Sequence, residues 1–381
     1  MPDSPALVPW DAWPTLSQER LLRAALAEPA VALDEWTRWT RLYTLDAADA
    51  ASTRLFPLVY EHLWRDAPDM PEAARLKGLY RHTWVRNQLH ARLMAEVIEA
   101  LSAAAIPTLV VKGLALQIVA YSGSGARAME DGDVVVPREL AVDAAGLLER
   151  RGWRAVFPPL SREMRCRASS PFEHARGGSF DLHWHILYDD MRPGADDESW
   201  AGAQPLELLH ASTLTLQPAD HLLHALTHGL AWAPISPIRW VADVVRLVRA
   251  SGPVLDWQRF WRRVAAHRVD WIVAQGLSYV ERLLPGVLPA PAVAHARAVR
   301  PSLGDRIDFA CRMRGRSFAP GYLPRFWRHF RRALPAARYG RGPIGFVRYC
   351  ADTARVERSW RTPWLLAREW GSRRQQGAMG N

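Results

Sequence analysis

The chain has little cysteine, and its few cysteines lie far apart. Of 381 residues, only Cys166, Cys311 and Cys350 are cysteines, an odd number without a Cys-x-x-Cys pair. This pattern argues against both a disulfide framework and a thiolate zinc site.

Long hydrophobic runs are also missing. No apolar stretch approaches the roughly 18 residues that a membrane-spanning helix needs, and the N-terminal Met1-Pro2-Asp3-Ser4 has neither a basic leader nor an apolar segment. Hydrophobic residues make up 49% of the chain and charged residues 23%, which is typical of a globular protein. We therefore expect a cytoplasmic protein without a transmembrane segment.

Lysine is scarce, whereas arginine is abundant. Only Lys77 and Lys112 accompany 47 arginines, so the chain uses arginine almost everywhere that a general cation suffices. An ammonium is a compact point charge that suits a phosphate oxygen and fits into a tight turn. The Lys112-Gly113 turn is therefore a candidate phosphate-binding element, although a chance lysine at the end of a strand is the alternative.

The net charge of +10 comes from the C-terminal region. From Arg312 onward there are 16 arginines and three acidic residues, which gives +13 and leaves −3 for the first 311 residues. Aromatic residues are interspersed with these arginines. Three interpretations remain open: an RNA- or DNA-binding surface, contact with an anionic membrane, or a set of solvated helices. No recognised nucleic-acid motif supports the first. We favour the solvated helices and, after them, an anionic partner or acceptor.

Two short segments combine acidic residues with an extended pattern. In Asp131-Gly132-Asp133-Val134-Val135-Val136 the two aspartates would project from the same side of a strand. In the segment 179–185, Asp181, His183 and His185 would share one face, while Leu182 and Trp184 join a core. Carboxylates held this close repel each other unless a cation lies between them.

This combination of residues suggests metal-assisted nucleotidyl transfer. Two divalent ions about 4 Å apart can stabilise the entering and leaving oxygens at a phosphorus atom, and Mg²⁺ or Mn²⁺ accepts carboxylate ligands. Asp131 and Asp133 could bridge such ions, with Asp181 next to the attacking hydroxyl. The helix N-terminus after Lys112 and Gly113 offers free amides for the triphosphate of ATP or another NTP.

The pattern of elements predicts an α/β (α+β) fold with helical regions on both sides. Helices are expected up to about residue 90 and over 93–104, followed by a strand at 108–111 and a helix at 114–121. Strands at 134–136, 153–157, 172–176 and around Asp181 complete a mixed α/β core over about 92–188. Beyond Asp196 and Asp197 the pattern is helical again, with helices at 218–230, 238–250, 257–267 and 272–284.

Several of these residues resemble a known family. The runs Val111-Lys112-Gly113, Arg127-x-Met129-x-Asp131-x-Asp133 and Phe180-Asp181-Leu182-His183-Trp184 look like the uncharacterised bacterial nucleotidyltransferase family of the DNA polymerase beta-like superfamily. His228-Gly229 and Arg239-Trp240-x-x-Asp243 resemble its following helical segment. The resemblance covers roughly residues 90 to 250.

The resemblance implies a polymerase-beta-like core with a mixed sheet, in which Asp131, Asp133 and Asp181 are metal ligands and catalytic residues. Lys112 and Gly113 replace the Gly-Gly or Gly-Ser turn of better-known members, and Arg127 and His183 complete the candidate nucleotide site. We expect a helical region at 1–90, the nucleotidyltransferase core at 91–200, a helical domain at 201–311 and an Arg- and aromatic-rich region at 312–381. The reaction implied is transfer of a nucleoside monophosphate from an NTP to an unidentified acceptor.

Alternatives remain for the reaction. The same cleft could transfer a sugar or phosphoryl group from a nucleotide-activated donor, or the protein could bind nucleotides without catalysis. An Asp-x-Asp pair is also common in solvated loops.

Alternatives remain for individual side chains as well. Arg127 could bind phosphate or balance local charge, and His183 could orient a ligand or be a hydrogen-bonded core residue. His221, His224 and His228 share a helix face, which indicates a buried polar face near the active-site cleft in preference to a metal site. Asp243 is expected to pair with Arg239.

Overall fold

The computed structural model describes residues 13–231, 238–313, 322–332 and 336–355. The N-terminal region forms five helices: α1 (Leu16–Leu26), α2 (Pro29–Leu42), α3 (Ala50–Thr53), α4 (Phe56–Leu63) and α5 (Ala73–Ser102). The side chain of Thr15 caps the backbone of Gln18 and the side chain of Gln18 caps that of Thr15, which is a capping box at the start of α1. The helix expected over 93–104 is the last part of the 30-residue α5, and residue 90 lies inside it.

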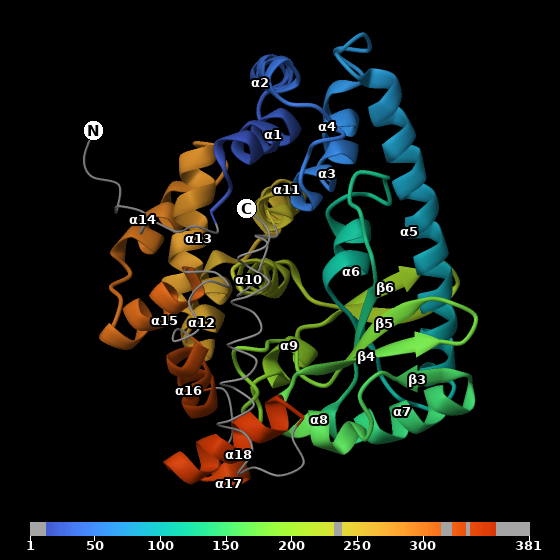
Figure 1. Ribbon diagram of the computed structural model, residues 1–381, viewed down its shortest axis with the longest axis vertical. Coiled ribbons are helices and arrows are strands. Elements are labelled where there is room, and N and C mark those ends of the chain that lie inside the picture. The colour runs from blue at the N-terminus through green and yellow to red at the C-terminus, as the bar shows by residue number, and fades with distance from the viewer. Residues whose placement is uncertain (1–12, 232–237, 314–321, 333–335, 356–381) are drawn as a thin grey trace, which may run out of the picture.

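A seven-stranded mixed sheet forms the centre of the protein (Figure 1). Its order is β3-β4-β5-β2-β1-β7-β6. The strands are β1 (Leu109–Val110), β2 (Gly132–Val135), β3 (Trp153–Ala155), β4 (Ser169–His174), β5 (Ser179–His183), β6 (Gln204–Leu208) and β7 (Ala211–Thr215). The β2–β5 and β1–β7 pairs are parallel and the other pairs are antiparallel. This arrangement confirms the predicted α/β core with a mixed sheet and flanking helices.

The β6–β7 hairpin was not predicted, because no strand was expected between the Asp181 strand and the helix at 218–230. Leu206 and Leu208 are buried while Glu207 between them is exposed, which is the alternation of a strand with one covered face. Leu209, with a φ of 56°, lies in the tight turn between the strands. The hairpin extends the sheet past β1.

Helices cover both faces of the sheet. Between the strands lie α6 (Lys112–Val119), the short η1 (Arg138–Leu140), α7 (Ala141–Arg150), α8 (Leu160–Cys166) and α9 (Asp197–Ala201). The second half of α5 and α7 pack on one face around Val110, Val134 and Leu182. The N-terminal helices and the helices after β7 pack on the other face around Leu109 and Val135. The alternation of β2 therefore turns Val134 and Asp133 to opposite faces.

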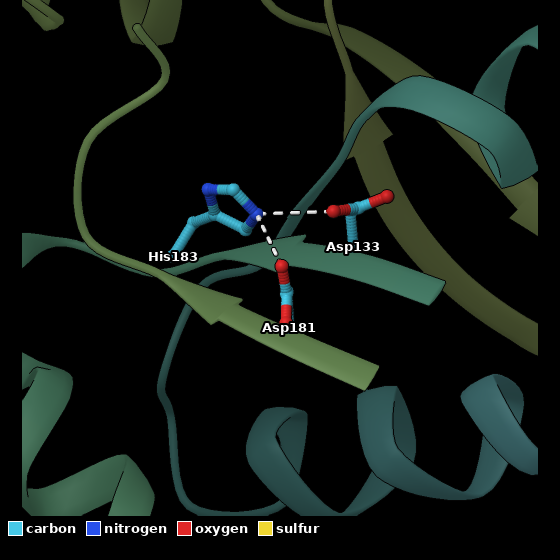
Figure 2. A group of neighbouring side chains, drawn as sticks. All are labelled: Asp133, Asp181 and His183. Atoms are coloured by element: carbon cyan, nitrogen blue, oxygen red, sulfur yellow. Dashed lines mark hydrogen bonds and ion pairs between the residues drawn. The ribbon is translucent and has the colours of Figure 1, made fainter. Parts of the chain in front are cut away.

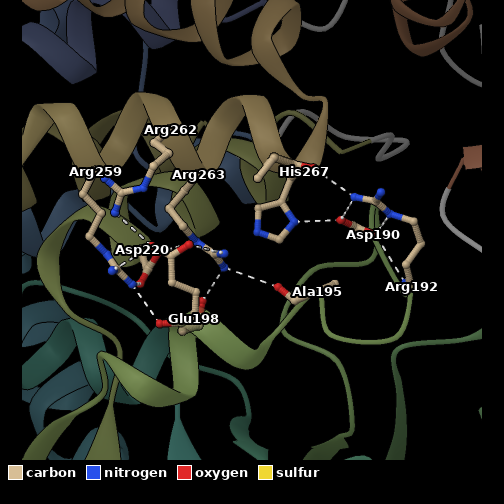
Figure 3. A network of polar contacts seen from close by, with 11 residues as sticks. Asp190, Arg192, Ala195, Glu198, Asp220, Arg259, Arg262, Arg263 and His267 are labelled. Atoms are coloured by element: carbon tan, nitrogen blue, oxygen red, sulfur yellow. Dashed lines mark hydrogen bonds and ion pairs between the residues drawn. The ribbon is translucent and has the colours of Figure 1, made fainter.

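The helices after β7 are α10 (Pro218–Gly229), α11 (Arg239–Ser251), η2 (Gly252–Val254), α12 (Trp257–His267), α13 (Asp270–Leu283), α14 (Ala290–Ala298) and α15 (Leu303–Met313). Ion pairs fix α12 against α9 and α10 (Figure 3). Asp220 on α10 accepts hydrogen bonds from Arg259, with a distance of 2.9 Å, and from Arg263, with a distance of 3.2 Å. Because Asp220 and Arg263 are buried, this pairing holds α10 in one position against α12.

The C-terminal segment adds α16 (Tyr322–Arg332), α17 (Ala336–Tyr339) and α18 (Pro343–Thr353). Phe330, Tyr349 and Cys350 form a small core with Cys166 of α8, and Phe326, Tyr339 and Phe346 pack around it. Several aromatic residues of the Arg-rich region are therefore packing residues, whereas Trp360, Trp364 and Trp370 lie outside the described residues. In the described part of the chain, no helix is both long and apolar enough to cross a membrane.

Candidate active site

Strand register places Asp133 and Asp181 side by side. β2 and β5 run parallel, with Asp133 opposite Asp181 and Val135 opposite His183. The period of two then turns Asp133, Asp181 and His183 toward the same face, the one that α6 and α10 cover. Figure 2 shows the three side chains converging above the two strands.

The three side chains form a donor set that fits a divalent cation. His183 Nε2 lies 3.0 Å from Asp133 Oδ1 and 4.0 Å from Asp181 Oδ2. One ligand atom from each residue lies within 4.8 Å of the others, which makes this a candidate metal-binding group among the described residues. Two carboxylates suit Mg²⁺ or Mn²⁺, and the imidazole is a ligand that favours Mn²⁺ over Mg²⁺.

Lys112 completes this cluster at the first residue of α6. Its Nζ lies 2.5 Å from Asp133 Oδ1 and 3.3 Å from His183 Nε2. Burial opposes the charged ammonium, but the carboxylates of Asp133, Asp181 and Asp131 outweigh it and raise the pKa of Lys112. Burial likewise acts to raise the pKa of Asp133, but Lys112 and His183 hold it well below its usual value. Both partners are therefore charged at neutral pH.

Asp131 lies apart from the three converging side chains. It directly precedes β2, is exposed, and supplies no atom to the compact donor group. Although the residue is exposed, the surrounding protein partly desolvates its carboxyl group, and this desolvation and the negative charge of Asp133 raise the pKa of Asp131 to about 6. The repulsion expected from the sequence is therefore present, and it acts mainly on Asp131.

The raised pKa of Asp131 predicts that the free energy of unfolding depends on pH when metal has been removed with EDTA. In the unfolded chain Asp131 would ionise near pH 4, whereas in the folded protein its pKa is about 6. The folded protein therefore binds an extra proton at Asp131. The stabilisation that this proton provides is complete below about pH 4 and is lost as the pH rises through 6. Because solvent screens an exposed group, we expect Asp131→Asn to gain only about 1 kcal/mol at pH 8 and almost nothing at pH 4. Calorimetric melting of both proteins from pH 4 to 8 measures the difference, and a constant difference across this range would contradict the assignment.

Arg127 lies in a buried ion pair with Asp243. Its Nε and Nη2 donate to the two carboxylate oxygens of Asp243 at 2.8 and 2.9 Å, and Tyr121 Oη donates to Oδ1 at 2.9 Å. Arg239, expected from the sequence to pair with Asp243, instead donates to the carbonyl of Ala128 at 2.6 Å. Helical spacing suggested the wrong partner because α11 turns Asp243 toward the loop before β2.

Gly113 allows the loop before β2, which carries Arg127 and Met129, to approach α6 closely. A Cβ atom at this position would lie 2.9 Å from Arg127 Nη1 and 3.3 Å from Met129 Cγ. The Nη1 atom is buried and has no hydrogen-bond partner in the described part of the chain. Arg127 therefore keeps one donor beside the N-terminal turn of α6.

The three histidines of α10 are not a compact metal site. His221 Nε2 hydrogen-bonds with Thr215 Oγ1 at 2.9 Å, while the rings of His224 and His228 stack with a centroid distance of 5.9 Å. Desolvation lowers the pKa of all three well below the ordinary value, so they are neutral at pH 7. Among the described residues, the candidate metal group contains none of the three.

A cavity of about 560 Å³ opens beside the carboxylates. Lys112, Asp181 and His183 line one end, and His224 and His228 line the wall that α10 contributes. The cavity continues to α13, α15 and α16, which lie to the left of the sheet in Figure 1. Sequence reasoning identified the acidic end and placed the α10 histidines near the cleft, but it missed the far wall, because that wall comes from segments distant in sequence.

The chain belongs to a family of nucleotidyltransferases. The family described as "Uncharacterised nucleotidyltransferase" matches residues 37–285, which is more than half of the chain and includes every element that carries the acidic site. No curated protein matches the chain. The nucleotidyltransferase resemblance found in the sequence is thus confirmed, and the class of reaction is that of a transferase acting on a nucleotide.

Proposed function

We propose that this protein moves a nucleoside monophosphate from an NTP to an acceptor hydroxyl or phosphate, with Mg²⁺ or Mn²⁺ as cofactor. The observation that carries the proposal is the in-register pair Asp133 and Asp181, next to Lys112 and at one end of a cavity. Membership of the nucleotidyltransferase family supports it. We further propose that the sheet and α6 correspond to the polymerase-beta-like core, and that ATP is among the donors. The cytoplasmic location expected from the sequence stays a prediction, and an NTP donor fits it.

Asp133, Asp181 and Asp131 would hold the divalent ions, with His183 beside them. Such an ion, when bound, neutralises charge on the phosphate oxygens and on the leaving pyrophosphate. Asp181, which lines the cavity, would accept the proton of the acceptor hydroxyl at a carboxylate oxygen. Asp131, at the exposed edge of the site, would contribute its carboxylate from the side of β2.

Lys112 and the first turn of α6 would hold the triphosphate. Lys112 has a φ of 52°, which is unusual for a residue with a side chain and costs on the order of 1 kcal/mol. This backbone conformation places its ammonium on Asp133, from which it can turn to a phosphate oxygen once cations neutralise the carboxylate. The helix begins without a side-chain cap, so its first amides remain as anion donors. Gly113 lies in this turn, and Arg127 Nη1 lies beside it.

The direct test is to incubate the protein with each NTP, Mg²⁺ or Mn²⁺, and pools of candidate acceptors, and to follow pyrophosphate and acceptor mass. Pyrophosphate release with a gain of one nucleoside monophosphate supports the proposal. A free nucleoside diphosphate with an added hexose would instead show sugar transfer. Tight NTP binding without any turnover would show a non-catalytic protein.

The two lysines of the chain provide a matched test of the phosphate contact. Lys112→Met is expected to raise the KM for NTP at least tenfold, since a charge-assisted hydrogen bond contributes about 1.5–3 kcal/mol. Lys77→Met removes the exposed lysine on α5 and should leave the KM unchanged. Steady-state pyrophosphate release measures both. Equal KM values for Lys112→Met and the wild type would remove Lys112 from the phosphate site.

A further inference from the structure

The far half of the cavity is walled by aromatic rings. Trp271 of α13 and Phe309 of α15 meet edge to face with a centroid distance of 6.3 Å, and Phe326 of α16 lines the same space. Tyr188 and His329 stack at 4.2 Å with an interplanar angle of 15°. Flat rings of this kind bind other flat rings by stacking.

Two arginines that line this far half, Arg328 and Arg167, are already paired within the protein. Arg328 forms ion pairs with Asp305 and, at 3.9 Å, with Asp308. Arg167 lies 2.9 Å from Glu163 and donates to the carbonyl of Thr353 at 3.0 Å. The strong attraction for phosphate is therefore at the opposite end, where Lys112 and the metal-binding carboxylates lie. The cavity thus has one end suited to phosphate and one suited to an uncharged planar group.

The C-terminal helices that form this wall are fixed to the core. Arg165 of α8 makes two hydrogen bonds of 2.9 Å to Asp352 of α18, and Arg355 donates to both oxygens of Glu163 at 3.1 and 3.0 Å. His329 Nε2 contacts the carbonyl of Tyr188 at 2.8 Å. In Figure 1, α18 lies beside α8 at the lower end of the sheet. The wall therefore has a fixed position relative to the strands that carry the acidic site.

Part of this wall lies outside the segment that matches the family. The match ends at residue 285, whereas Phe309, Phe326 and His329 come after it. The volume of about 560 Å³ is within the range of small-ligand pockets, about 300–1,000 Å³. A cavity of this size fits a single nucleotide.

We propose that the aromatic wall formed by Trp271, Phe309, Phe326 and Tyr188 binds the base of the NTP, with the triphosphate at Lys112. This inference rests on the proposed function, because it takes the ligand to be an NTP. It adds that the C-terminal helices α15 and α16 are part of the substrate site. The wall would then contribute to NTP affinity through the base alone.

The test compares two ligands that differ in the nucleoside. Each NTP and inorganic tripolyphosphate are titrated calorimetrically into the full-length protein with Mg²⁺. We expect the preferred NTP to bind at least about tenfold more tightly than tripolyphosphate, as stacking of one base provides. Phe309→Leu and Phe326→Leu, which keep apolar volume but remove a ring, should each weaken NTP binding about fivefold and leave tripolyphosphate binding unchanged. Phe346→Leu is the matched control, because Phe346 packs in the C-terminal core and does not line the cavity.

Equal affinity for NTP and tripolyphosphate in the wild type would overturn the inference, and so would NTP affinity that neither leucine substitution changes. Loss of tripolyphosphate binding in the same variants would also overturn it, since it would indicate a general structural effect. Failure of the proposed function is a separate result. If NTP binding depends on the rings but no pyrophosphate is released, the result supports base binding by the aromatic wall but not the proposed catalysis.

Discussion

Asp133→Asn is expected to reduce pyrophosphate release by about a thousandfold or more. Asp133 is the buried carboxylate nearest to both His183 and Lys112, with contacts of 3.0 and 2.5 Å. An amide at this position would remove a negative ligand from the proposed metal site, where a bound ion would contribute several kcal/mol of charge stabilisation in the transition state. Single-turnover assays with saturating NTP and metal measure the effect on the chemical step.

Stability provides an independent check on the same substitution. In metal-free protein, Asp133→Asn leaves the ammonium of Lys112 without its partner, which is expected to cost about 3 kcal/mol. Asp131→Asn should act in the opposite direction at pH 8, as its raised pKa implies. Asp143→Asn, which changes an exposed carboxylate on α7, is the control and should alter neither activity nor stability. Retention of full activity by Asp133→Asn would exclude this residue as a metal ligand.

Asp243→Asn is expected to lower the free energy of unfolding by about 3–5 kcal/mol. Asp243 is buried and receives two hydrogen bonds from Arg127 and one from Tyr121. Its charge also compensates Arg239, although burial and the positive charge of Arg127 still lower the pKa of Arg239 to about 10. Removing the single carboxylate would leave the buried guanidinium of Arg127 and the partly buried one of Arg239 uncompensated. Chemical denaturation at pH 7 measures the loss.

The matched control is Asp34→Asn on α2. Asp34 pairs with Arg38 at 2.9 Å, but its side chain is 53% exposed, so its loss should change stability by less than about 0.5 kcal/mol. Similar effects for Asp243→Asn and Asp34→Asn would contradict the structural role of the buried pair. Because Asp243 also orients Arg127, reduced NTP affinity should accompany the loss of stability.

The acidic centre could be predicted because the strand pattern that indicates it lies within a few residues of each aspartate. Asp133 and Asp181 each lie in a strand with a period of two, so the face that each side chain occupies follows from the sequence alone. The parallel pairing of β2 with β5 then brings the two carboxylates together. Lys112 stood out by its rarity, and the structure places it on Asp133.

Other parts of the site depend on long-range packing and could not be read from spacing. The partner of Asp243 is Arg127, which lies 116 residues away in the sequence, whereas Arg239 one helical turn away seemed the natural choice. The different environments of Asp131 and Asp133 arise from the edge of β2, where one side chain faces solvent and the other is covered. The β6–β7 hairpin contains leucines and threonines in a short run, and its role as sheet strands depends on pairing with the distant β1.

Anomalous diffraction from crystals soaked with Mn²⁺ and a non-hydrolysable NTP analogue tests the central claim most directly. We predict an anomalous peak between the carboxylates of Asp133 and Asp181, at about 2.2 Å from their oxygens, with Lys112 Nζ turned from Asp133 to a phosphate oxygen. The same crystals of Asp181→Asn should lose or weaken that peak. A bound analogue without a metal peak between these two residues, and with Lys112 still paired to Asp133, would contradict the assignment of this site.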